Sequence, residues 1–289
     1  MEIILGKTAG FCYGVKRAVD GAKEEIAKNG ESYCLGEIVH NKNVVKSLQE
    51  KGMKFIENID EAKATTVIRA HGVAKEVYEK AKKNKIELVD LTCPNVLKIH
   101  DIADEYCKKG YYIIVVGTSE IHPEVIGIMS FAGENSKLVK NEEEIGMAIK
   151  SIEKSGLKNV LIISQTTCNS KKFDNIAEKF QKDLAKSINL EIKKTVCMAT
   201  ETRQKETKEL AQNVDCMIII GDKKSSNTNK LYDISCEFAP KAIFIENYNE
   251  LNLEELPKTG KIGIMAGAST PKEDINDVMK KIENSQNGL

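Results

Sequence analysis

The sequence predicts an α/β fold made of three similar small domains with mostly parallel sheets. Apolar runs alternate with amphipathic helical stretches along all 289 residues, which is typical of parallel strands joined by helices. Three segments also share one pattern, an apolar run followed by an asparagine and an acidic cluster at a helix start. They are KFIENIDEA, KLVKNEEEI and IFIENYNEL, and their asparagines are Asn58, Asn141 and Asn247. Together these observations indicate an internal threefold repeat.

Three cysteines share a register with this repeat. Cys12, Cys93 and Cys197 precede the three asparagines by 46, 48 and 50 residues. In the first repeat the apolar run EIIL leads to Cys12. The helical pattern that follows has one apolar face, formed by Val15, Ala18, Val19, Ala22 and Ile26. Each cysteine is therefore expected between the end of a strand and the start of a helix.

Two further strand ends recur in each repeat. The second strand end carries His40 in GEIVHN, His122 in GTSEIHPE and Ser226 in GDKKSSN, which follow the cysteines by 28, 29 and 29 residues. The last strand end carries His71 in VIRAHGV, Thr166 in LIISQTT and Ser269 in IGIMAGAST. Open α/β sheets bind ligands at the carboxyl ends of their strands. If the three copies surround a pseudo-threefold axis, the three cysteine loops can converge at its centre. The expected domains are residues 1–93, 94–193 and 194–272, followed by a C-terminal tail or helix over 273–289.

Composition excludes several function classes. Lys+Arg and Asp+Glu both number 43, so no global field attracts nucleic acid or an acidic membrane surface. The first apolar stretch is too short for a signal peptide, and no window approaches the length of a membrane span. We expect a cytoplasmic protein.

The sequence also lacks the common nucleotide-binding motifs. GKT at Gly6 to Thr8 lacks the upstream glycine of a phosphate loop, and no GxGxxG follows a strand, so neither ATP nor NAD is inferred.

Eight cysteines without a secretory signal indicate thiols or metal ligands rather than disulfides. The three cysteines in register suit an iron–sulfur cluster, in which one iron would lack a protein ligand and could bind a substrate oxygen. Zinc held by three cysteines and a water is the competing metal. Four other cysteines lie inside strand or helix patterns and are expected to be structural: Cys34, Cys107, Cys216 and Cys236. Cys168 in SQTTCNS also follows a strand, so its position alone does not exclude it.

Polar residues at the strand ends indicate an anion site. Three histidines, His40, His71 and His122, stand in such loops, whereas His100 lies in a helical pattern. With the Ser and Asn side chains of SSN and GAST, they suggest donors around a multiply charged anion. These additional donors are Ser225, Ser226, Asn227 and Ser269, although each could equally be a helix cap. Glu124 follows Pro123 at a helix start, where it is either a capping carboxylate or a proton source.

At these residues the chain resembles the 4-hydroxy-3-methylbut-2-enyl diphosphate reductase family, also called LytB/IspH. The resemblance runs nearly end to end through AGFCYGVKRAV, GEIVHN, RAHGV, DLTCPNV, HPEVIG, SQTT, CMATETRQ, SSNTNKL and AGAST. Two positions depart from the family pattern. Met198 replaces a residue that is often Asn, and Thr118 stands where some members have His before HPE.

The resemblance implies a trefoil around one 4Fe–4S cluster held by Cys12, Cys93 and Cys197, with one open iron, and it removes Cys168 from the ligands. It implies that Glu124 and Thr166 face the substrate hydroxyl as catalytic residues. The other site residues would surround the substrate diphosphate: His40, His71, His122, Ser225, Ser226, Asn227 and Ser269.

The implied reaction is the two-electron reductive dehydroxylation of (E)-4-hydroxy-3-methylbut-2-enyl diphosphate to isopentenyl and dimethylallyl diphosphate, the last step of the non-mevalonate isoprenoid pathway. A ferredoxin or flavodoxin is the implied electron donor, because the chain shows no flavin or nicotinamide motif. Two alternatives stay open. One is a quinolinate-synthase-like 4Fe–4S dehydratase, and the other is a non-enzymatic zinc-stabilised module that binds a phosphometabolite.

Overall fold

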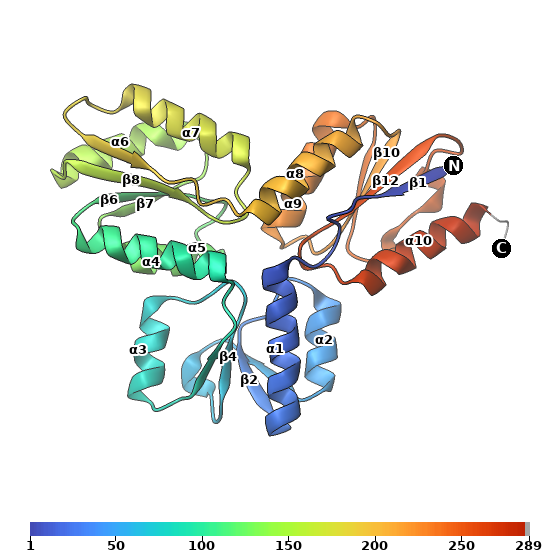
Figure 1. Ribbon diagram of the computed structural model, residues 1–289, viewed down its shortest axis with the longest axis horizontal. Helices are drawn as coiled ribbons and strands as arrows, with labels where there is room; N and C mark the ends of the chain where they lie inside the picture. The colour runs from blue at the N-terminus through green and yellow to red at the C-terminus, as the bar shows by residue number, and fades with distance from the viewer. Residues whose placement is uncertain (287–289) are drawn as a thin grey trace. The chain divides into compact units, whose positions relative to one another are not determined.

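Three four-stranded sheets, each with parallel pairing, organise the computed structural model, which describes residues 1–286 (Figure 1). Sheet A has the order β1 (Glu2–Leu5), β12 (Lys261–Ala266), β10 (Cys216–Ile220) and β11 (Ala242–Ile245). Sheet B has the order β3 (Met53–Ile56), β2 (Ser32–Leu35), β4 (Thr66–Ile68) and β5 (Leu88–Asp90). Sheet C has the order β7 (Ser136–Val139), β6 (Tyr112–Val116), β8 (Asn159–Ser164) and β9 (Asn189–Ile192). The predicted α/β class with three parallel units is confirmed.

All three sheets share one strand order. In sheets B and C the first strand lies between the second and the third, and the fourth lies beyond the third. Sheet A repeats this order with β10, β11 and β12, and its fourth strand is β1 from the other end of the chain (Figure 1). Leu5 of β1 pairs with Ile264 of β12. The strand that the sequence places in the first repeat therefore completes the sheet of the third. The limits of the three domains stay a prediction.

The fourth strand of each sheet leads to one of the three cysteines in register. Cys12 follows β1, Cys93 follows β5 and Cys197 follows β9. A helix starts directly after each of them: α1 (Tyr13–Asn29), α4 (Pro94–Lys108) and α8 (Met198–Ala211). The expected strand–cysteine–helix order is confirmed at all three positions.

The remaining helices connect the strands and cover the sheets. They are α2 (Lys42–Glu50), α3 (Lys75–Lys83), α5 (Pro123–Ala132), α6 (Ile145–Ser155), α7 (Ser170–Asp183), α9 (Ser226–Phe238) and α10 (Lys272–Gln286). Sheet C is buried on both faces, by Ile152 and Phe173 of α6 and α7 on one side and by Ile99 and Ile128 of α4 and α5 on the other. Sheet A is likewise packed against α10 on one face and against α8 and α9 on the other. This double burial explains why the strands are nearly continuous apolar runs.

The three repeated asparagines cap short 3₁₀ helices: η1 (Ile59–Glu61), η2 (Glu142–Glu144) and η3 (Tyr248–Glu250). The side chains of Asn58 and Asn247 accept from the backbone N–H two residues further on, and that of Asn141 accepts from the backbone N–H of Glu144, three residues further on. A fourth 3₁₀ helix is η4 (Leu253–Glu255). The shared sequence pattern is therefore a shared capping motif.

One expected strand end is displaced. The apolar residues of GEIVH lie outside a strand, because β2 ends at Leu35 and Gly36 adopts φ +68°. This positive φ favours glycine, and a side chain at Gly36 would displace the guanidinium of Arg69. His40 consequently stands on a loop rather than at the end of a strand.

The chain divides into two compact units. Unit 1 contains Met1–Lys16, Val39–Ser47 and the residues from Met198 onward, and unit 2 contains Arg17–Ile38 and Leu48–Cys197. Sheet A belongs to unit 1, and sheets B and C belong to unit 2. Among the helices that the structure describes, none combines the length and apolarity needed to cross a bilayer.

Candidate functional site

A buried carboxyl group lies in unit 2 at the start of α5. Glu124 is 2% exposed, and its Oε1 accepts a hydrogen bond of 2.6 Å from the Thr166 backbone N–H. Its Oε2 accepts one of 2.9 Å from the Thr166 hydroxyl. Burial raises the pKa of Glu124 to about 7, against the opposing effect of hydrogen bonds from Thr166 and Gln165. A carboxyl group of this kind can hold a proton near neutral pH and exchange it through the Thr166 hydroxyl.

His122 is the N-cap of α5 and touches the same network. Its Nδ1 accepts from the Glu124 backbone N–H at 3.2 Å, so a neutral imidazole carries its proton on Nε2. This tautomer places an N–H donor at Nε2, which lies 3.4 Å from Gln165 Nε2. The His122 ring also meets His71 edge to face, with ring centroids 5.7 Å apart.

Gln165 connects these residues through hydrogen bonds, a role that the sequence did not predict. Its side chain is fully buried, and its Nε2 lies 3.3 Å from His122 Nδ1. Its Oε1 accepts from the backbone and hydroxyl of Thr118 at 3.2 and 3.0 Å. Gln165 stands inside the SQTT motif, in which the sequence predicts only the next residue, Thr166, as a site residue. Thr118, one of the two departures from the family pattern, is thus one hydrogen bond away from a residue that orients His122.

The two cysteine loops of unit 2 join the network through their backbones. The N–H of Cys93 donates to the carbonyl of Ala70, the residue before His71, at 3.0 Å. The N–H of Cys197 donates to the carbonyl of Thr166 at 3.0 Å. Unit 2 therefore brings together half of the predicted site: His71, Cys93, His122, Glu124, Thr166 and Cys197.

The other half of the predicted site lies in unit 1: Cys12, His40, Ser225, Ser226, Asn227 and Ser269. The N–H of Cys12 donates to the carbonyl of Ala268 at 3.2 Å, and the hydroxyl of Ser269 donates to the carbonyl of His40 at 2.8 Å. Ser225 caps α9 by accepting from the backbone of Thr228. These bonds gather the Cys12, His40 and GAST loops beside one another.

Asn227 has the surroundings expected of a ligand-binding amide. Its side chain is 4% exposed, and both Nδ2 and Oδ1 are buried without a hydrogen-bond partner among residues 1–286. Leaving a buried amide unsatisfied costs about 1 to 3 kcal/mol, which a bound oxyanion would offset. The next residue packs tightly against the GAST loop, because a side chain at Gly267 would collide with Thr228. Asn227 therefore occupies a constrained position.

Asp274 of α10 anchors the His40 loop and was also missed. Its carboxylate accepts from the side-chain amides of Asn41 and Asn43 at 3.3 and 2.9 Å. Burial raises the pKa of Asp274, although both amides favour its charged form. Asp274 and His40 are more than two hundred residues apart in the sequence, so no local pattern predicted that they lie close together.

The eight cysteines fall into distinct environments. Within residues 1–286 none forms a disulfide, and Cys12, Cys93 and Cys197 are half-buried. Cys34 and Cys216 are fully buried, and burial raises their pKa to about 12 and about 11, so they are inert thiols. Cys168 packs into the core of sheet C. In the described part of the chain no group of three or more His, Cys, Asp and Glu side chains is gathered closely enough to hold a metal ion.

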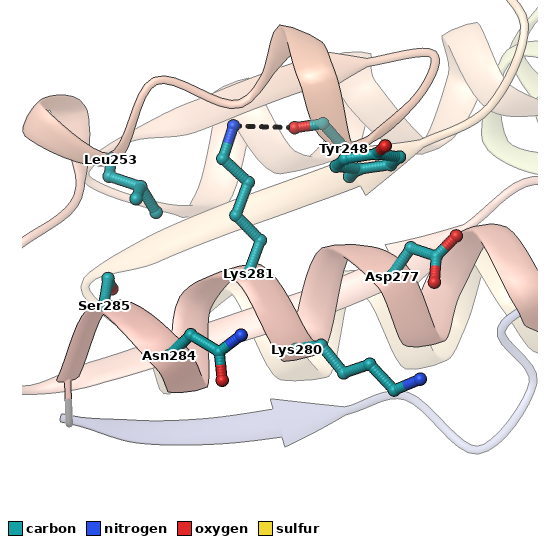
Figure 2. Close-up of a pocket in the computed structure, with 7 residues that line it drawn as sticks. All are labelled: Tyr248, Leu253, Asp277, Lys280, Lys281, Asn284 and Ser285. Atoms are coloured by element: carbon teal, nitrogen blue, oxygen red, sulfur yellow. Dashed lines mark hydrogen bonds between the residues drawn. The ribbon is translucent and has the colours of Figure 1, made fainter. Parts of the chain in front are cut away.

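A separate cavity of about 480 Å³ lies between α10 and the η3–η4 segment of unit 1 (Figure 2). Tyr248, Leu253 and Lys280 line it, and Lys281 donates to the carbonyl of Tyr248 at 2.9 Å. It contains none of the predicted site residues.

Comparison with known proteins identifies the family. The family model described as LytB protein matches residues 3–283 of the chain. The chain belongs to the LytB family. A 4-hydroxy-3-methylbut-2-enyl diphosphate reductase of Clostridioides difficile is 42% identical over 98% of this chain and 100% of its own length. The corresponding protein of Geobacter metallireducens is 40% identical over 98% of this chain and 97% of its own length.

Two solved structures of LytB-type reductases are also similar. A structure of (E)-4-hydroxy-3-methyl-but-2-enyl diphosphate reductase, described as the terminal enzyme of the non-mevalonate pathway, matches with a TM-score of 0.69 and 36% identity. It covers 98% of this chain and 100% of its own. The E-1-hydroxy-2-methyl-but-2-enyl-4-diphosphate reductase from Plasmodium falciparum matches with a TM-score of 0.86 and 28% identity, over 98% and 88% of the two chains. The resemblance inferred from the motifs is confirmed, and the roles of the individual site residues stay predictions.

Proposed function

We propose that this protein reductively dehydroxylates (E)-4-hydroxy-3-methylbut-2-enyl diphosphate to isopentenyl diphosphate and dimethylallyl diphosphate, the last step of the non-mevalonate isoprenoid pathway. The observation that carries this proposal is the similarity to reductases of this substrate along 98% of the chain. The buried Glu124 carboxyl beside the Thr166 hydroxyl adds a proton source to it. The proposal includes the arrangement of the three sheets around a pseudo-threefold axis.

We propose that Cys12, Cys93 and Cys197 hold one 4Fe–4S cluster with one open iron. The donor set fits this group, because all three are half-buried thiols that lie directly before a helix, and thiols are the usual ligands of such clusters. A bound cluster would relay to the substrate two electrons that come from the external donor, and it would offer a Lewis-acidic iron for the substrate hydroxyl. Zinc fits the same three thiols, and metal analysis decides between them.

The remaining residues bind the diphosphate and move the proton. The Nε2–H of His122 and the amide of Asn227 provide donors for diphosphate oxygens, together with His40, His71, Ser225, Ser226 and Ser269. Glu124 delivers a proton through the Thr166 hydroxyl, so that the substrate oxygen leaves as water. A second proton ends the reaction at either of two carbons, which accounts for two products.

The electron donor is proposed to be a ferredoxin or flavodoxin, and the compartment the cytoplasm. The test is an anaerobic assay in which a reduced dye is mixed with protein and the allylic diphosphate. Dye oxidation that depends on the substrate, with formation of both five-carbon diphosphates, supports the proposal. A dehydratase would consume substrate without oxidising the dye, and a zinc-stabilised binding module would convert nothing.

A further inference from the structure

We propose that Arg203 and Glu206 of α8 are positioning residues that clamp the loop carrying Cys12, and that this clamp sets the retention and the electronic properties of the cluster. The inference rests on the proposed function, because it assigns these residues a role toward the proposed Cys12 ligand.

The Arg203 guanidinium binds backbone carbonyl groups of the loop that carries Cys12. Its guanidinium is 3% exposed, and Nε and Nη2 donate to the carbonyl of Thr8 at 2.9 and 2.7 Å. Nη2 also donates to the carbonyl of Gly10 at 2.7 Å. Bonds from a charged donor are about twice as strong as neutral ones, and a rigid planar fork fixes both carbonyls at once. Thr8 and Gly10, which precede Cys12 by four and two residues, are thereby held from one side.

Glu206, one helical turn further along α8, holds the same loop by its N–H groups. Its Oε1 accepts from the N–H of Lys7 at 2.5 Å, and its Oε2 accepts from the N–H of Thr8 at 2.9 Å. The hydroxyl of Thr8 donates to Oε2 as well. Burial opposes ionisation of Glu206, but these bonds outweigh it and keep its pKa below the ordinary value. The side chain is therefore a charged acceptor at neutral pH.

The opposite side of the loop is hydrogen-bonded to β12 and to the residues that follow it. Gly6, Gly10 and Cys12 donate their N–H groups to the carbonyls of Ile264, Ala266 and Ala268. Gly10 has φ +99°, and a side chain there would crowd the carbonyl of Thr270 at 3.3 Å. The loop is thus confined between α8 on one side and the GAST segment on the other, which leaves little freedom for the backbone of Cys12.

α8 also follows a second proposed ligand directly in the sequence, since it begins at the residue after Cys197. Within unit 1, the second and third turns of this helix hold the Cys12 loop through Arg203 and Glu206. A ligand set held by rigid, hydrogen-bonded supports loses metal slowly, and loosening such supports typically costs ten- to a hundredfold in affinity. The buried guanidinium also places a fixed positive charge beside the loop.

The experiment compares the variants Glu206→Gln and Arg203→Gln with a control, Glu209→Gln. The control makes the same Glu-to-Gln change on the same helix, at an exposed residue whose ion pair with Lys205 is 3.8 Å long. All proteins are purified anaerobically, and their iron and sulfide are counted. The rate of iron release to a chelator and the electron paramagnetic resonance spectrum of the reduced protein are then measured. Melting of the metal-free chains reports general stability.

We expect both clamp variants to release iron about tenfold faster than the parent or more, with an altered resonance spectrum, while Glu209→Gln matches the parent. Arg203→Lys should recover part of the effect, because an ammonium can donate to one of the two carbonyls. If the Glu206 variant released iron at the same rate as the parent and gave the same resonance spectrum, the proposed role of the clamp would be overturned, even if the melting point of the variant fell. That variant decides the question if Arg203→Gln fails to fold. A parent protein without iron and sulfide would instead overturn the proposed function itself.

Discussion

Replacing Glu124 by Gln separates catalysis from capping. The amide keeps the size of the carboxyl group and can satisfy both groups of Thr166. Its oxygen accepts the backbone N–H that now lies 2.6 Å from Oε1, and its NH₂ faces a hydroxyl that can accept as well as donate. At a pH where Glu124 is protonated both side chains are neutral and can make the same two hydrogen bonds, so the free energy of unfolding should change by no more than about 1 kcal/mol.

Turnover should respond very differently. An amide cannot release a proton, and general acid assistance is typically worth about a hundredfold to ten-thousandfold in rate. We therefore expect anaerobic turnover with a reduced dye to fall by at least about a hundredfold, while iron content and the cluster spectrum stay normal. Near-parental turnover would refute the assignment and leave Glu124 with the structural role of holding Thr166.

The pH dependence of stability gives an independent check on the same residue. Burial raises the pKa of Glu124 from an ordinary 4.5 to about 7 in the folded protein. The folded state therefore binds more protons than the unfolded state between these values, and the contribution is present below pH 4.5 and lost as the pH rises through 7. Relative to Glu124→Gln, the parent should lose roughly 3 kcal/mol of unfolding free energy across this window. Parallel denaturant curves for the two proteins would argue against a raised pKa.

Three further predictions concern the other parts of the site. Cys12→Ser should abolish retention of iron and sulfide, whereas Cys168→Ser, a change in the sheet C core, should leave both near normal, and an equal loss would contradict the ligand assignment. Asn227→Ala should weaken substrate binding about tenfold or more while the cluster spectrum persists, and unchanged affinity by titration would remove Asn227 from the diphosphate site. Gln165→Ala frees both His122 and the Thr118 backbone, so the Michaelis constant and turnover should both worsen, and kinetics equal to those of the parent would show that His122 needs no such support.

Local sequence predicted the strand and helix types but not the long-range pairings. The run EIIL is a strand as expected, yet its partner is β12 near the other end of the chain, and no local pattern specifies a partner. The apolar residues of GEIVH read as a strand, but the positive φ of Gly36 ends β2 before them. The shared cysteine register was informative because it reflects the fourth strand of each sheet.

Site residues were predictable where they belonged to a repeated loop. His122, Glu124 and Thr166 lie together as their strand-end positions suggested. Gln165 and Asp274 were not found, because each acts by holding another residue, and such support depends on side chains distant in sequence. Arg203 belongs to the same group: its motif was visible, but its bond to the Cys12 loop was not.

The most direct measurement of the central claim is an electron count made on anaerobically purified protein with known iron and sulfide content. The account predicts close to four irons and four sulfides per chain and two electrons withdrawn from the reduced dye for each molecule of isopentenyl or dimethylallyl diphosphate formed. Zinc in place of iron, or consumption of the allylic diphosphate without oxidation of the dye, would contradict it.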